Sequence, residues 1–197
     1  MGFSIERALR HRKLLRMDSQ EIETYLAELG AELKRRGVRK PIRLMLIGGA
    51  YMLVLERASR TTEDIDIFWL EGDAFQHMRG VLSECVVTIT RRYRLRPDWL
   101  NYLSQILLQN EIIIPRGKLW KRYGPLHIYI PPKAYMLALK IMAGRDKDLV
   151  DCAILLPQTN IKTRRQARQL LDRYILPQAQ EKNALQIENA LNRLFQK

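Results

Sequence analysis

The feature that most constrains this chain is a short apolar run that ends at two consecutive glycines. Residues 44–47 contain no polar side chain, which is expected of a strand buried on both faces of a sheet. Gly48 and Gly49 interrupt the run, and residues 50–58 then have the apolar spacing of a helix. A strand that turns through glycines into a helix leaves backbone N–H groups free at the helix start, where they can bind a phosphate.

A second strand is expected over residues 64–69, because polar and apolar residues alternate there. Asp64 and Asp66 share one face of such a strand, with Cα atoms about 6–7 Å apart. Two carboxylates at this distance repel each other unless a cation lies between them. Mg²⁺ prefers carboxylate oxygens and keeps substrate phosphates as further ligands, so these two residues are candidate metal ligands. The alternatives are an ordinary glycine turn and a solvated pair of acids.

The order of these features resembles the nucleotidyltransferase superfamily, whose pattern is an apolar strand, Gly-Gly or Gly-Ser, a helix, and then Asp-x-Asp on the next strand. The flank Arg60-x-Thr62-x-Asp64-Ile-Asp66 is similar to the form found in AbiEii-type and related uncharacterised bacterial nucleotidyltransferase-like families. The resemblance covers residues 42–156. It implies an α/β (α+β) fold with a short mixed sheet flanked by helices and with helical segments at both ends of the chain.

The resemblance also implies a reaction in which a nucleoside monophosphate moves from an NTP to an acceptor and pyrophosphate is released. Asp64 and Asp66 would hold Mg²⁺ or Mn²⁺. Arg60 or Lys140 would neutralise the charge that develops on the leaving group. The resemblance further implies that the nucleotide is bound by Gly48, Gly49, Arg60 and Thr62. The two glycines would accommodate its phosphates.

Residues 137–151 resemble a downstream motif of AbiEii-like proteins, in which a lysine on one helix and an aspartate that begins the next helix complete the active pocket. By that resemblance Lys140 would contact the triphosphate, and Asp148 or Asp151 would supply further acid near the metal or nucleophile. Independently of any family, Lys140 interrupts an apolar helix face and needs an anionic partner or access to solvent. Asp148 and Asp151 share a helix face. An interhelical ion pair without a substrate role is the alternative, and the two are compatible.

The sequence departs from the family pattern in its acids. Many nucleotidyltransferases place a third carboxylate on a late strand, but the last strand expected here contains His127 and Tyr129 and no acid, which weakens the case for two metal ions. The proline and acid of residues 97–101 predict the start of a helix. The same residues resemble another segment of these families. In that segment an acid commonly follows the asparagine, which is Asn101 here. This chain has Tyr102 there.

The charge of the chain favours a polyanionic partner. Lys and Arg number 34 against 21 Asp and Glu, which gives a net charge of +13. Such a surplus favours nucleic acid through phosphate contacts, so RNA or a tRNA end is the preferred acceptor, with a protein hydroxyl or a small molecule also open. The alternative, which runs of charge on helices favour, is that these faces are only solvated. The resemblance allows a toxin–antitoxin role with a cognate protein partner. The alternative function is a catalytically inactive nucleotidyltransferase-like module that binds nucleic acid or a partner protein.

Three consecutive parts are expected within one compact unit: a helical segment over residues 1–40, the nucleotidyltransferase-like core over 41–131, and a helical region over 132–197. The sequence lacks a signal peptide and an uncharged stretch of membrane-spanning length, so we expect a cytoplasmic protein without membrane contact. The other expected helices are 4–16, 19–36, 73–84, 133–143, 147–156, 163–176 and 178–195. The other expected strands are 86–89 and a hairpin of 118–122 with 127–130.

Overall fold

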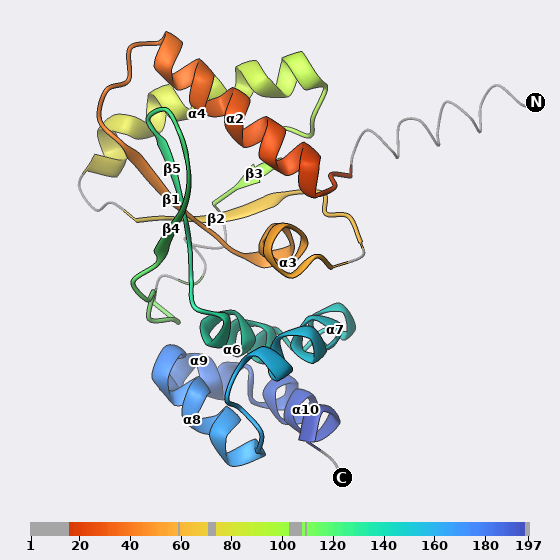
Figure 1. Cartoon of the computed structure of the whole chain (residues 1–197). Coiled ribbons are helices and arrows are strands. Elements are labelled where there is room, and N and C mark those ends of the chain that lie inside the picture. The colour runs from red at the N-terminus through yellow and green to blue at the C-terminus, as the bar shows by residue number, and fades with distance from the viewer. Residues whose placement is uncertain (1–15, 59, 71–73, 103–107, 109, 196–197) are drawn as a thin grey trace, which may run out of the picture. The chain divides into compact units, whose positions relative to one another are not determined.

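The computed structural model describes residues 16–195 apart from residues 59, 71–73, 103–107 and 109, and describes residues 74–77 by their backbone alone (Figure 1). The chain forms two compact units. Unit 1 comprises residues 1–104 and 119–130, and unit 2 comprises residues 105–118 and 131–197. The helix expected over residues 4–16 lies outside the described residues.

Unit 1 contains a five-stranded mixed sheet with the strand order β3-β2-β1-β5-β4. β1 is antiparallel to β2 and parallel to β5, and β2 is parallel to β3. The chain is therefore mixed α/β, as the sequence predicts. The strands are β1 (Ile42–Leu46), β2 (Ile65–Trp69), β3 (Leu100–Asn101), β4 (Lys118–Tyr123) and β5 (Leu126–Ile130).

The central strand β1 is buried on both faces. Leu44, Met45 and Leu46 have no exposed surface, although they point alternately to opposite sides of the sheet. This explains the absence of polar alternation in the sequence. The expected hairpin of β4 and β5 is also confirmed, with Gly124 in a left-handed conformation at its turn.

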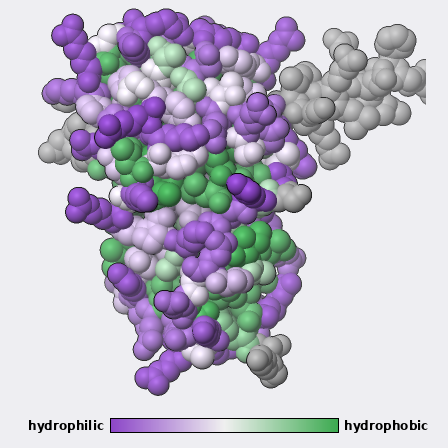
Figure 2. Space-filling model, in the orientation of Figure 1, coloured by the Kyte–Doolittle hydropathy of each residue, from purple (hydrophilic) through white to green (hydrophobic). Residues whose placement is uncertain are grey.

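Three described helices belong to unit 1: α2 (Ser19–Arg35), α3 (Gly48–Glu56) and α4 (Ala74–Tyr93). α2 begins with a capping box, in which the Asp18 side chain accepts a hydrogen bond from the Glu21 N–H at 2.9 Å and the Glu21 carboxylate accepts one from the Asp18 N–H at 3.0 Å. The expected cap is thus confirmed. α2 contacts α4, α3 and β5 (Figure 1). The visible surface over α2 is mostly hydrophilic (Figure 2).

The strand expected over residues 86–89 was wrong, because α4 continues through it to Tyr93. Leu82, Cys85 and Ile89 recur at helical spacing and are buried, so packing overrides the strand preference of the β-branched residues between them. The Thr90 hydroxyl donates to the Val86 carbonyl oxygen one turn earlier at 2.8 Å, which a helix allows.

The helix expected to begin at residue 97 was also wrong. The residues form a turn and then β3, and the Ile65 N–H of β2 donates to the Trp99 carbonyl oxygen at 2.6 Å. Trp99 is buried, and its indole N–H donates to the Thr90 hydroxyl at 3.0 Å. Burial of this tryptophan, which the local sequence does not reveal, fixes the segment beside β2.

Unit 2 is helical, and its central helix is α6, which contacts α7, α8 and α10. The bounds expected for α6, 133–143, are confirmed. The last expected helix is divided into α9 and α10 at Asn183. Within the described ranges, no helix has the length and apolar character needed to cross a membrane. The elements are α6 (Lys133–Ala143), α7 (Asp146–Leu155), the 3₁₀ helix η1 (Leu156–Gln158), α8 (Arg164–Tyr174), α9 (Pro177–Lys182) and α10 (Ala184–Phe195).

Candidate functional site

The two glycines form the first residues of α3, two positions earlier than the helix start expected from the sequence. Gly48 has a φ of +66°, in the left-handed region that favours glycine. The preceding residue, Ile47, is extended and gives no side-chain cap. The first N–H groups of the helix therefore receive no acceptor from the N-cap side chain, which is the arrangement that suits an anion.

The glycines also make room for two side chains of the next segment. A Cβ atom at Gly48 would lie 2.9 Å from the Cβ of Asp66 and closer still to its Oδ2. A Cβ atom at Gly49 would lie 2.9 Å from the Thr62 hydroxyl oxygen. Any larger residue would have to push these side chains away. The structure thus brings together at the start of α3 four residues that the sequence predicts as a site.

Thr62 holds the segment that carries the first aspartate. Its N–H donates to the Met17 carbonyl oxygen at 3.0 Å, and its own carbonyl oxygen accepts from the Met17 N–H at 2.7 Å. Its hydroxyl donates to the Asp64 carbonyl oxygen at 3.1 Å and lies 3.4 Å from the Asp64 Oδ1. Asp64 precedes β2, and Asp66 lies within it; both side chains are half-buried. Arg60, also half-buried, lies in the segment between α3 and β2.

Asn101 is a member of this cluster that the sequence did not identify. It is paired with Asp66 in the register of β2 and β3, and its side-chain N–H donates to the Asp66 Oδ1 at 3.0 Å. The resemblance of residues 97–101 to a segment of the nucleotidyltransferase-like families points to this asparagine, but the proline and acid of the segment predict a helix instead of a strand. A strand in parallel register with β2 would have placed Asn101 beside the acidic pair.

The oxygen atoms of this cluster provide only some of the ligands that a hard divalent cation needs. Within the described ranges, no group of three or more His, Cys, Asp or Glu side chains is placed to hold a metal ion. Asp64 and Asp66 supply two carboxylates, with a hydroxyl and an amide nearby. Mg²⁺ is commonly bound by one or two carboxylates together with substrate phosphates, so these residues suit a nucleotide-bound ion better than an all-protein cage.

An ion pair network borders this cluster. Arg96 lies 2.8 Å from a Glu63 carboxylate oxygen and 2.9 Å from one of Asp98. The hydrogen bond from Arg96 lowers the pKa of Asp98 against the opposing effect of burial. Arg16 lies 3.8 Å from the other Glu63 oxygen. These charges are largely neutralised by one another.

The last strand, expected from the sequence to contain no acid, does not border β2. β5 lies on the far side of β1, and its polar side chains are His127 and Tyr129. Burial, assisted by the charges of Arg122 and Arg43, lowers the pKa of His127. The other neighbour of β2 is β3, so the position beside Asp66 is occupied by an amide.

The second predicted cluster lies in unit 2. Lys140 of α6 is 6% exposed, and its Nζ lies 2.9 Å from the Asp148 Oδ1 and 2.8 Å from the Asp151 Oδ2, both on α7. Arg145 lies 2.5 Å from the other Asp148 oxygen. Burial by itself would raise the pKa of Asp148, but the hydrogen bond from Arg145 and the charge of Lys140 outweigh it, and the pKa is lowered. The interhelical ion pair is thus confirmed. A joint pocket with Asp64 and Asp66 stays a prediction.

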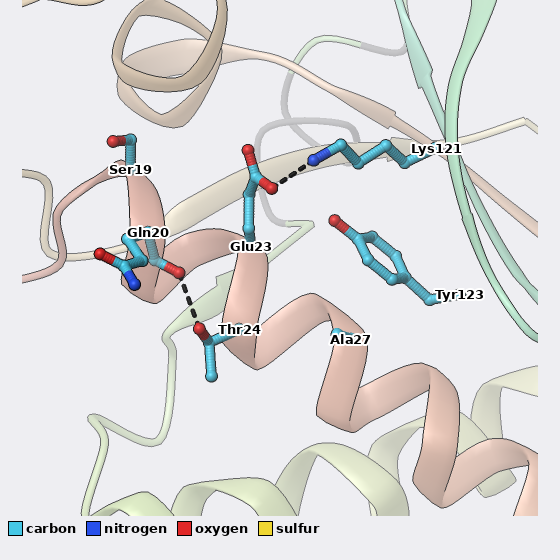
Figure 3. A pocket seen from close by; sticks show the side chains of 7 residues that line it. All are labelled: Ser19, Gln20, Glu23, Thr24, Ala27, Lys121 and Tyr123. Atoms are coloured by element: carbon cyan, nitrogen blue, oxygen red, sulfur yellow. Dashed lines mark hydrogen bonds and ion pairs between the residues drawn. The ribbon is translucent and has the colours of Figure 1, made fainter.

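A separate open hollow of about 470 Å³ lies between α2 and β4 (Figure 3). Lys121 and Glu23 point toward each other across it and form an ion pair. Burial raises the pKa of Tyr123, which also lines it, to about 12. The paired charges leave the hollow without a surplus charge of either sign, and it contains none of the predicted site residues. Its lining residues are Ser19, Gln20, Glu23, Thr24, Ala27, Lys121 and Tyr123.

Comparison with known proteins found no matching family model, no similar curated protein and no similar solved structure. The interpretation of the site therefore depends on its own geometry. That geometry brings together Gly48, Gly49, Thr62, Asp64 and Asp66 in one unit and Lys140, Asp148 and Asp151 in the other.

Proposed function

We propose that this protein is a nucleotidyltransferase that depends on Mg²⁺ or Mn²⁺ and transfers a nucleoside monophosphate from an NTP to an acceptor. One observation carries the proposal: the carboxylate of Asp66 lies against the first residue of α3, beside the hydroxyl group that contacts Asp64. A helix start that could bind a phosphate and two carboxylates that could bind its metal ion would then act side by side. These are the two parts that a nucleotide with its metal ion requires.

Each residue has a task that follows from its position. The N–H groups at Gly48 and Gly49 would hold the phosphates, because the N-cap residue Ile47 provides no side-chain acceptor at this helix start. Asp64 and Asp66 would bind the divalent cation, which would neutralise charge on the phosphates and on the leaving pyrophosphate. Thr62 holds the Asp64 segment in place through its bonds to Met17 and to the Asp64 carbonyl oxygen. Arg60 is proposed to contact the nucleotide from the same segment.

RNA is the proposed acceptor, on the strength of the net charge of +13. The test is incubation of the protein with each α-labelled NTP and Mg²⁺ or Mn²⁺, with total RNA and a cell lysate as acceptor pools. An Asp64→Asn/Asp66→Asn variant is the matched control, because it keeps side-chain size and removes both charges. Label on RNA with the parent alone supports the proposal. Label on protein or on a small molecule keeps the reaction and changes the acceptor.

A second candidate function is a catalytically inactive module that binds nucleic acid or a partner protein. It is favoured by the lack of an acid on β5 and by the absence of a three-acid cluster among the described residues. The discriminating measurement is RNA binding at increasing salt, because phosphate contacts weaken steeply with salt. Salt-sensitive RNA binding that is unaffected by Asp64→Asn/Asp66→Asn, without label transfer from any NTP, would favour this module.

A further inference from the structure

We propose that Asn101 occupies the third ligand position of the carboxylate site and that its amide limits the metal binding of the protein alone. The inference rests on the proposed function, since it concerns the cation of the same site. Asn101 lies directly across from Asp66 in the parallel pairing of β2 and β3. Side chains of directly paired residues point to the same face of a sheet, so both project toward the same place.

The hydrogen bond shows what the amide does in the absence of an ion. The Asn101 side-chain N–H donates to the Asp66 Oδ1 at 3.0 Å, while the other oxygen, Oδ2, points to the start of α3. The reverse orientation of the amide would set two oxygens against each other, which is repulsive. Asn101 therefore positions the Asp66 carboxylate with one oxygen tied and the other directed toward the proposed phosphate site.

The charge of the proposed metal site depends on whether residue 101 carries an amide or a carboxylate. With an amide at this position, the cluster holds two carboxylates, Asp64 and Asp66. The affinity of oxygen sites for hard cations rises with the number of charged ligands. The site is then suited to an ion that arrives with a nucleotide and leaves with pyrophosphate. A carboxylate at position 101 would make a site that retains the ion by itself.

The next residue provides a matched control. The hydroxyl of Tyr102 accepts a hydrogen bond from Arg79 of α4 at 3.3 Å, and the Arg79 guanidinium lies 5.4 Å from the ring centre. Residue 102 therefore faces α4. A carboxylate placed there adds the same charge to the protein one residue after β3, at a position that faces Arg79.

The test is calorimetric titration of the full chain with MnCl₂ in the absence of nucleotide. We expect Asn101→Asp to bind Mn²⁺ about tenfold more tightly than the parent, or better, because a third carboxylate joins the site. The gain should vanish in Asn101→Asp/Asp66→Asn, and Tyr102→Asp should behave as the parent. Thermal unfolding provides a second readout: Mn²⁺ should raise the Tm of Asn101→Asp more than that of the parent.

The outcomes separate this inference from the proposed function. Mn²⁺ binding by the parent that requires Asp64, with no gain in Asn101→Asp, would overturn the inference and leave the proposed function standing. No Mn²⁺ binding by either protein would overturn the inference, whereas the proposed function is overturned only if the folded parent transfers no label from any NTP with Mg²⁺ or Mn²⁺. A gain in Asn101→Asp beside a parent that binds no Mn²⁺ without nucleotide would support the inference and leave the proposed function standing.

A further variant covers the case in which Asn101→Asp does not fold. Asn101→Leu has a similar size and cannot donate to Asp66. It should bind Mn²⁺ more weakly than the parent, because the Asp66 carboxylate loses its orientation. Equal affinity in Asn101→Leu and the parent would then contradict the role of Asn101.

Discussion

The two predicted acidic clusters differ in how deeply their carboxylates are buried. In unit 2, Asp148 and Asp151 have no exposed surface, and each contacts Lys140 within 3 Å. In unit 1, Asp64 and Asp66 are half-buried, and their contacts include a hydroxyl and an amide. The first cluster is closed off from water with its own cations, and the second remains partly open to water.

On the proposed function, the buried cluster stabilises unit 2 and the half-exposed cluster binds the metal ion of the nucleotide. A buried carboxylate requires a nearby cation. Without one, the loss of its hydration costs several kcal/mol. Lys140 and Arg145 meet that requirement within unit 2. Half-exposed carboxylates can remain hydrated without a cation and can exchange water for an arriving ion. The predictions below test this contrast, from the largest expected effect on stability to the smallest.

Removal of the buried lysine should have the largest effect. Lys140→Met keeps the length of the side chain and leaves two buried carboxylates without their shared cation. We expect a loss of about 3–5 kcal/mol in the free energy of unfolding, measured by urea denaturation. Lys147→Met removes an exposed lysine of the same helix pair and should change the free energy by less than about 0.5 kcal/mol. Equal effects of the two variants would contradict the structural role of the cluster.

The glycine at the start of α3 should come next. Gly48→Ala places a side chain in a left-handed conformation, at a cost of about 1–2 kcal/mol, and also presses on Asp66. Gly37→Ala is the matched control, because Gly37 has a φ of +76° and no atom within 4 Å of the added Cβ. The excess destabilisation of Gly48→Ala over Gly37→Ala should be about 1–3 kcal/mol, the usual cost of overpacking. No excess in urea unfolding would mean that Asp66 does not lie against the helix start.

Acid should weaken unit 2 through Asp148. The pKa of this carboxyl is lowered in the folded state, so in the unfolded state it takes up a proton at a higher pH. Its contribution to stability is therefore present above the unfolded pKa of about 3.9 and is lost as the pH falls through the lower folded value. Urea unfolding between neutral and strongly acidic pH should show a smaller acid loss in Asp148→Asn than in the parent. An equal loss in both proteins would contradict the assignment.

Removal of the two half-exposed carboxylates should affect stability least. Asp64→Asn/Asp66→Asn replaces two half-exposed carboxylates by side chains of the same size that still offer an oxygen acceptor, so the free energy of unfolding should change by less than about 1 kcal/mol. The same variant should lose Mn²⁺ binding. A large destabilisation would place this pair in the same class as the buried cluster and remove the contrast.

Some of the site could be predicted because its signals are local. The apolar run before Gly48 and the alternation around Asp66 each specify a strand, and the interruption of an apolar face by Lys140 requires an anionic partner. The structure gives that lysine two partners on the next helix. In each case a short stretch of sequence contains both the feature and its physical cause.

Other parts could not be predicted because they depend on distant contacts. β3 contains two residues, too few to show a period, and the proline and acid that precede it, Pro97 and Asp98, predict a helix. Its position is set by the hydrogen bond to Ile65 and by the burial of Trp99. The contact of Asn101 with Asp66 joins residues 35 positions apart and exists only once β2 and β3 pair. The continuation of α4 likewise follows from packing against α2.

The most direct test of the central claim is equilibrium dialysis of the full chain against each NTP, with and without Mg²⁺. The parent should bind at least one NTP at a single site per chain, and binding should require Mg²⁺. The Asp64→Asn/Asp66→Asn variant, shown to unfold at the same urea concentration as the parent, should not bind. Binding that is equal in the parent and the variant, or absent from the folded parent with all four nucleotides, would contradict the assignment of this cluster as a nucleotide site.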